Sequence, residues 1–120
     1  MEIEYYTRDR GDSPVSDFLC TLSGKHFKKI EKDIDRLKEY GLQLLLKTKD
    51  VKKFKGNNKY DGLYELITNY QGIYYRTMFT VINDKYWLIS MFKKKSNKTP
   101  LNEIKKANNI KELLKQKYGI

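Results

Sequence analysis

The sequence predicts a two-layer α+β domain, in which an antiparallel β-meander and an N-terminal strand have their helices packed on one face. Three observations support this class: alternating apolar residues in four segments, apolar residues at helical spacing in three others, and tight-turn residues between the last strands. In chain order the predicted elements read β-α-α-β-β-β-α, and strands joined by short turns pair antiparallel. We expect residues 1–120 to form a single domain.

The N-terminal half contains one short strand followed by two amphipathic helices. Residues 2–7 alternate in polarity, which is typical of a half-buried strand. Apolar residues between 15 and 22 then recur at helical spacing, and Pro14 suits the first turn of that helix. A second apolar stripe covers residues 27–37, and Gly41 is expected to end its helix.

The C-terminal half contains the meander and a final helix. The expected strands cover residues 62–68, 73–82 and 85–92. Asn83 and Asp84 suit a tight turn between the last two strands. The final helix begins at Pro100, and its inner side is expected to carry Leu101, Ile104, Ala107 and Leu114.

Composition narrows the functional classes. The chain has 25 basic and 15 acidic residues, which gives a net charge of +10, and only four of the basic residues are arginine. A charge of this size favours a nucleic acid or another polyanion as partner. No apolar run approaches the ~20 residues of a membrane span, and the N-terminus lacks a signal-peptide pattern, so we expect a cytoplasmic protein without a membrane partner.

Most familiar catalytic devices are missing from the sequence. There is no glycine-rich phosphate loop and no carboxylate cluster that would hold a metal. Cys20 and His26 are the only residues of their kinds, which excludes an internal disulfide and a Cys/His zinc site. For Cys20 we expect a buried or partly buried place in a helix, and for His26 a surface or capping role. No cofactor is expected.

Lysines gather in two places. Four cations and no acid lie in "FKKKSNKTP", where a strand meets the positive N-terminal end of a helix, namely Lys93, Lys94, Lys95 and Lys98. A second group, between residues 47 and 59, includes Lys52, Lys53 and Lys55. Each group is either a solvated surface or a site for a polyanion.

Strand alternation decides which side chains share a face of the sheet. Leu63, Glu65 and Ile67 are predicted to share one side of the first meander strand. On the next strand, Tyr74 and Arg76 point away from the more apolar set, so we expect Arg76 on the open face of the sheet. An ion pair with Glu65 is the simpler structural role for this arginine.

These residues carry a resemblance. "LYEL", then "YYR" on the next strand, then "FKKKSNKTP" before "EIKKA", resembles the RelE/ParE superfamily of toxins, and within it the HigB-like, phage-derived branch. The resemblance is specific from Leu63 to Ala107 and only topological before that. This sequence has Tyr64 where that branch usually has tryptophan, and Ile67 where it commonly has arginine.

The resemblance implies a RelE-like fold and a toxin of a type II toxin–antitoxin system that acts as a metal-independent, ribosome-dependent mRNA endoribonuclease. Its expected partners are a helix-turn-helix antitoxin of the HigA kind, the ribosome and mRNA. The alternatives are a non-catalytic basic nucleic-acid-binding module and a gyrase-directed toxin of the ParE kind, because fold alone does not fix activity.

The expected site follows from the same resemblance and from the need for cations at a metal-free phosphate. The catalytic candidates are Arg76, Lys94, Lys98 and Glu65. The candidates for RNA binding are Lys52, Lys53, Lys55, Lys93, Lys95 and Tyr74. Arginine holds two phosphate oxygens in a fork, while one crowded lysine is expected to act as the base for the 2′-OH.

Overall fold

The computed structural model describes residues 1–54, 58–94 and 98–119, and it confirms the α+β class. In chain order its elements are β1 (Glu2–Tyr5), α1 (Pro14–Leu19), α2 (Gly24–Tyr40), α3 (Leu42–Lys47), β2 (Val51–Lys53), the 3₁₀ turn η1 (Asn58–Tyr60), β3 (Leu63–Tyr70), β4 (Ile73–Ile82), β5 (Lys85–Lys94) and α4 (Leu101–Lys117). Among the described residues, no helix is long and apolar enough to cross a membrane.

One five-stranded sheet organises the molecule, with the strand order β1-β5-β4-β3-β2. Strands β2 to β5 pair antiparallel with their neighbours, whereas β1 lies parallel to β5 at the edge. The predicted turn at Asn83 and Asp84 is confirmed, since both residues adopt positive φ, as a tight two-residue hairpin turn requires. The meander is therefore the predicted one, extended by a strand on each side.

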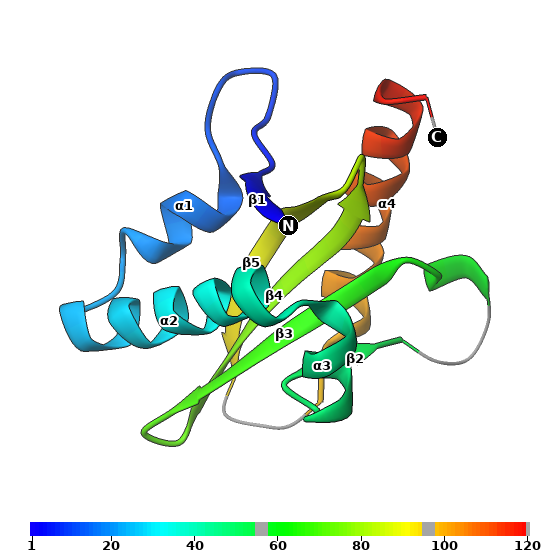
Figure 1. Cartoon of the computed structure of the whole chain (residues 1–120). Helices are drawn as coiled ribbons and strands as arrows, with labels where there is room; N and C mark the ends of the chain where they lie inside the picture. The colour runs from blue at the N-terminus through cyan, green and yellow to red at the C-terminus, as the bar shows by residue number, and fades with distance from the viewer. Residues whose placement is uncertain (55–57, 95–97, 120) are drawn as a thin grey trace.

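The first face of the sheet packs against α1, α2 and α3 (Figure 1). The stripe that predicts α2 is buried here through Ile30, Ile34 and Leu37, and it meets Phe79 and Leu88 from the sheet. Helix α2 forms because its apolar residues recur every three or four positions, while its other side carries alternating charges. This packing forms the larger of the two buried clusters.

The opposite face packs against α4, so the prediction that the helices cover one face is wrong. Ala107 and Leu114 of α4 lie on Leu63, Met78 and Ile82 of the sheet. Charged residues on β3 and β4 suggest an open polar face, yet most of their same-face neighbours are apolar and need cover. The result is three layers, with the sheet between α4 and the other helices (Figure 1).

Two residues of α4 differ from the expectations for this helix or add to them. The predicted inner position of Leu101 is wrong, because 56% of this residue is exposed at the first turn. Further along, the buried Lys111 donates a 2.6 Å hydrogen bond from Nζ to the carbonyl oxygen of Asp61. This contact ties the second half of α4 to the loop that precedes β3.

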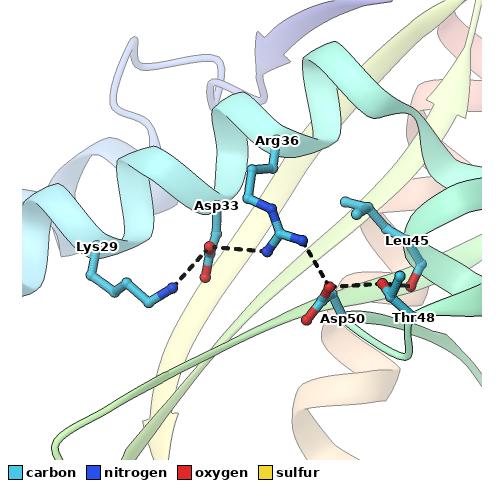
Figure 2. A network of polar contacts seen from close by, with 6 residues as sticks. All are labelled: Lys29, Asp33, Arg36, Leu45, Thr48 and Asp50. Carbon is cyan, nitrogen blue, oxygen red and sulfur yellow. Dashed lines mark hydrogen bonds and ion pairs between the residues drawn. The ribbon is translucent and has the colours of Figure 1, made fainter.

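The sequence patterns do not predict α3 or β2. Helix α3 is almost uniformly apolar over its first five residues and lacks a period, and β2 is only three residues long. Figure 2 shows the polar network that places them. Arg36 of α2 lies 3.1 Å from the carboxylate of Asp50, which also accepts a 2.7 Å hydrogen bond from Thr48. The network thereby fixes the turn that delivers β2 to the edge of β3.

Candidate functional site

The candidate site lies on the α4 side of the sheet, where β5 ends and α4 begins. Pairing places Lys52 opposite Glu65 across β2 and β3, and Tyr74 opposite Lys94 across β4 and β5. Arg76 stands two residues from Tyr74 on the same face. The register places Lys52 and Glu65 four positions along the sheet from Tyr74 and Lys94, with Arg76 between them, so the candidate site extends over four strands next to the start of α4.

A buried ion pair forms the base of this site. Nη1 of Arg76 lies 2.7 Å from Oε1 of Glu65, which confirms the predicted pair between neighbouring strands. The prediction that Arg76 stands on an open face is wrong, because only 1% of this residue is exposed, and Glu65 is 3% exposed. The cause is the α4 layer, which encloses both charges, and the contact between them offsets the cost of their burial.

Thr99 connects this pair to the start of α4. Its hydroxyl donates a 2.6 Å hydrogen bond to Oε2 of Glu65, so both oxygens of that carboxylate are engaged. One residue earlier, the carbonyl oxygen of Lys98 accepts a 2.9 Å hydrogen bond from Nζ of Lys94. The segment before α4 is thus fastened to both β3 and β5.

Three lysines lie near the start of α4, where the preceding segment bonds to β3 and β5. The side chains of Lys52 and Lys98 are exposed, and Lys94 is half-buried. Within residues 1–54, 58–94 and 98–119, no acid forms an ion pair with any of these three lysines. Tyr74, opposite Lys94, is half-buried, and the guanidinium carbon of Arg76 lies 5.7 Å from the centre of its ring. The arrangement offers uncompensated positive charge beside an aromatic surface.

The structure divides the predicted RNA-binding lysines between two faces. Lys53 pairs with Tyr64 and Lys93 pairs with Tyr75, so both are directed to the side of α1, α2 and α3. Lys52 lies with the site instead. Lys55 and Lys95 fall outside the described residues. The roles predicted for all these side chains remain predictions.

Thr99 is the member of this site that the sequence-based predictions did not include. The sequence contains a signal, since Thr99 precedes a proline that begins a helix, and a residue before proline is held extended. A threonine next to a helix suggests a cap for that helix. A bond to a carboxylate on a distant strand is a tertiary contact that spacing along the chain does not indicate.

His26 and Cys20 both lie away from this site. Nδ1 of His26 is 2.8 Å from the hydroxyl of Tyr75, and its ring packs edge-on against Tyr70, so this half-buried histidine is a packing residue on the opposite face. Burial raises the pKa of the Tyr75 phenol. The prediction that Cys20 is buried or partly buried in a helix is wrong, because this residue follows the last turn of α1 and is exposed.

Metal ligands do not gather anywhere in the described part of the chain. Residues 1–54, 58–94 and 98–119 contain no group of three His, Cys, Asp or Glu side chains that could hold a metal ion. The chemistry that these residues offer at the start of α4 is that of lysine, arginine, glutamate, threonine and tyrosine.

A small α+β sheet with a basic site at its last strand and helix is consistent with a toxin of the RelE type. The profile of a family described as "Phage derived protein Gp49-like (DUF891)" matches residues 17–112. The match covers most of the chain, which therefore belongs to this phage-derived Gp49-like family. A search among curated proteins finds no match.

The Gp49-like family is a RelE/HigB-type toxin family. It is associated with the toxins of toxin–antitoxin systems, including toxins that are endoribonucleases, and membership implies an antitoxin as partner. The family match extends over β3, β4, β5 and the first part of α4, and so includes the whole candidate site.

Proposed function

We propose that this protein is a single-domain, HigB-like toxin of a type II toxin–antitoxin system that inhibits translation by cutting mRNA on the ribosome. The observation that carries the proposal is the set of uncompensated lysines Lys52, Lys94 and Lys98 around the start of α4. Lysine side chains are flexible, and the buried Glu65–Arg76 pair provides a rigid support next to them. RNA is the polyanion that the family association favours.

The cleavage needs no group that this site lacks. The 2′-OH of the message attacks the adjacent phosphate, a base removes its proton, and an acid protonates the 5′ oxygen that leaves. In the proposed site, Lys94 and Lys98 supply the base and the acid between them, and their charges stabilise the crowded phosphate. Tyr74 stacks on a base of the message, as aromatic side chains do with unpaired RNA.

Burial assigns a different task to the other two catalytic candidates. A guanidinium that is 1% exposed does not reach a phosphate in this arrangement, and both oxygens of Glu65 already accept hydrogen bonds. We therefore propose that Arg76 and Glu65 hold the site in shape, with Glu65 orienting Thr99. The lysines, together with Tyr74, make the contacts with RNA.

The proposal is tested by inducing the protein in a bacterium and mapping new mRNA ends with translation either running or blocked. We expect new ends only while translation runs. The variant Lys94→Ala/Lys98→Ala should lose cleavage by about 10²–10³-fold, as expected when charge stabilisation at a transition state is removed. Lys47→Ala/Lys49→Ala removes the same charge near the end of α3 and serves as the matched control.

Three outcomes would contradict the proposal in different ways. Broken DNA in place of cut mRNA would identify a gyrase-directed toxin. Growth inhibition that declines gradually with each lysine removed, without new mRNA ends, would identify a binding module. Equal losses from both double variants would mean that the site has been placed at the wrong end of the sheet.

A further inference from the structure

The hydroxyl of Thr99 is directed away from the helix that it precedes. A threonine at the start of a helix commonly caps it by accepting a hydrogen bond from a backbone N–H. Here the N-cap position is Pro100, and the first turn of α4 has no side-chain cap. Thr99 instead donates to Oε2 of Glu65, a carboxylate that lies 34 positions earlier in the chain and is 3% exposed.

The contact joins a buried charge to exposed ones. Glu65 is fixed from below by Arg76, through a 2.7 Å contact to its other oxygen. Lys98, the residue next to Thr99, has its carbonyl oxygen held by the ammonium of Lys94 at 2.9 Å. Two polar contacts lead from Arg76 through Glu65 to Thr99, the peptide bond joins Thr99 to Lys98, and a third polar contact joins Lys98 to Lys94.

We propose that Thr99 is a positioning residue that holds Lys98 and Lys94 in the geometry needed for RNA cleavage, an inference that rests on the proposed function. Thr99 carries no charge and performs no proton transfer itself. Lysine side chains are long and flexible, so their placement depends on the backbone from which they extend. Loss of the Thr99 bond frees that backbone from β3 without changing the number of cations.

The inference predicts a loss of rate without a loss of binding. A shift of about 1 Å at a reacting group lowers a rate by up to about 100-fold. Affinity for RNA depends mainly on the number of cations, which Thr99→Val does not change. We expect Thr99→Val to slow cleavage by about 10–100-fold while its affinity for ribosomes, and the dependence of that affinity on salt, stay within about twofold.

Matched variants separate this role from a general loss of stability. Thr99→Ser keeps the hydroxyl and should cleave at close to the wild-type rate. Thr80→Val removes another threonine bond, of 2.7 Å to the carbonyl oxygen of Gly62, and Thr80 lies six positions along β4 from Tyr74, the partner of Lys94. It should lower the unfolding temperature without slowing cleavage.

The experiment measures single-turnover cleavage of a reporter mRNA on purified translating ribosomes, with each variant well below its unfolding temperature. A slow Thr99→Val variant beside active Thr99→Ser and Thr80→Val variants supports the inference. A Thr99→Val variant as fast as wild type, or one no slower than Thr80→Val, overturns it. Absence of cleavage by the wild-type protein overturns the proposed function, and the positioning role with it.

Discussion

The buried pair of Glu65 and Arg76 predicts an unusual pattern of stability. Arg76→Met leaves the Glu65 carboxylate enclosed, and among the described residues the Thr99 hydroxyl is then its remaining hydrogen-bond donor. Breaking one side of a buried ion pair costs about 3–5 kcal/mol, because the other charge stays buried without compensation. For a domain of this size that loss corresponds to roughly 10–20 °C in Tm.

The double variant Glu65→Leu/Arg76→Met should recover most of this loss. Both charges are then replaced by apolar side chains on a face where the neighbours Met78 and Leu63 are already buried, and such replacements are often neutral or stabilising. Urea unfolding of the wild type, both single variants and the double variant gives the coupling energy directly.

Arg36→Met provides the matched control for that cycle. Arg36 also forms ion pairs, with Asp33 and Asp50 (Figure 2), but 36% of its side chain is exposed. Water screens the pair with Asp50, whose side chain is 34% exposed, and the buried Asp33 keeps Lys29 at 3.1 Å, so the loss of Arg36 should cost about 1 kcal/mol or less. If Arg76→Met costs no more than Arg36→Met, the reasoning from burial is refuted.

The double variant also separates folding from function. Glu65→Leu removes the acceptor of the Thr99 hydroxyl, so a folded Glu65→Leu/Arg76→Met protein should no longer inhibit growth at an expression level equal to wild type. Full toxicity in this folded variant would mean that the pair supports the fold alone and does not position the lysines.

The remaining predictions concern a buried lysine, a buried tyrosine and the antitoxin. Lys111→Met should lower the free energy of unfolding by about 1–3 kcal/mol through loss of the bond to Asp61, and an unchanged urea midpoint would contradict this. Because burial raises the pKa of Tyr75 above its ordinary 10.0, its contribution to stability is complete below pH 10 and is lost as pH rises toward the folded-state pKa. Alkaline unfolding should therefore be less steep in Tyr75→Phe. Co-expression with the cognate antitoxin should restore growth and yield a complex in which Lys94 is protected from acetylation, with association slowed by salt; cleavage undiminished in that complex would show another mode of neutralisation.

The sequence predicts most of the fold because its strands and long helices have clear periods. The stripe of α2, the alternation of β3 to β5 and the Asn83 turn all follow from local pattern. The position of α4 does not follow from local pattern. Arg76 and Glu65 suggest a polar, exposed face of the sheet, and their mutual contact offsets the cost of covering them with a helix. Short elements such as β2 are too brief for a period to indicate them.

The candidate site was predictable in composition and only partly in geometry. Alternation places Glu65, Arg76 and Tyr74 on one face, and pairing adds Lys52 to them. The separation of Lys53 and Lys93 from the site also follows from alternation, once the strand boundaries and partners are known. Burial of the arginine and the bond from Thr99 depend on the tertiary arrangement of α4, which no local pattern encodes.

The positive charge of the site depends on which residues the nearby acids pair with. Asp50, the acid closest in sequence to the lysines of β2, is engaged by Arg36 and Thr48 (Figure 2). Glu65, the acid that lies opposite Lys52, is engaged by Arg76 and Thr99. Each of these acids is thus paired with an arginine and a threonine within the fold, and neither forms an ion pair with a lysine in the described part of the chain. The positive electrostatic potential of the lysines on this side of the sheet is therefore not cancelled by these acids. A positive potential at a surface raises both the local concentration of a polyanion and its rate of association. Because two arginines pair with these acids, Lys52, Lys94 and Lys98 have no acidic partner among the described residues.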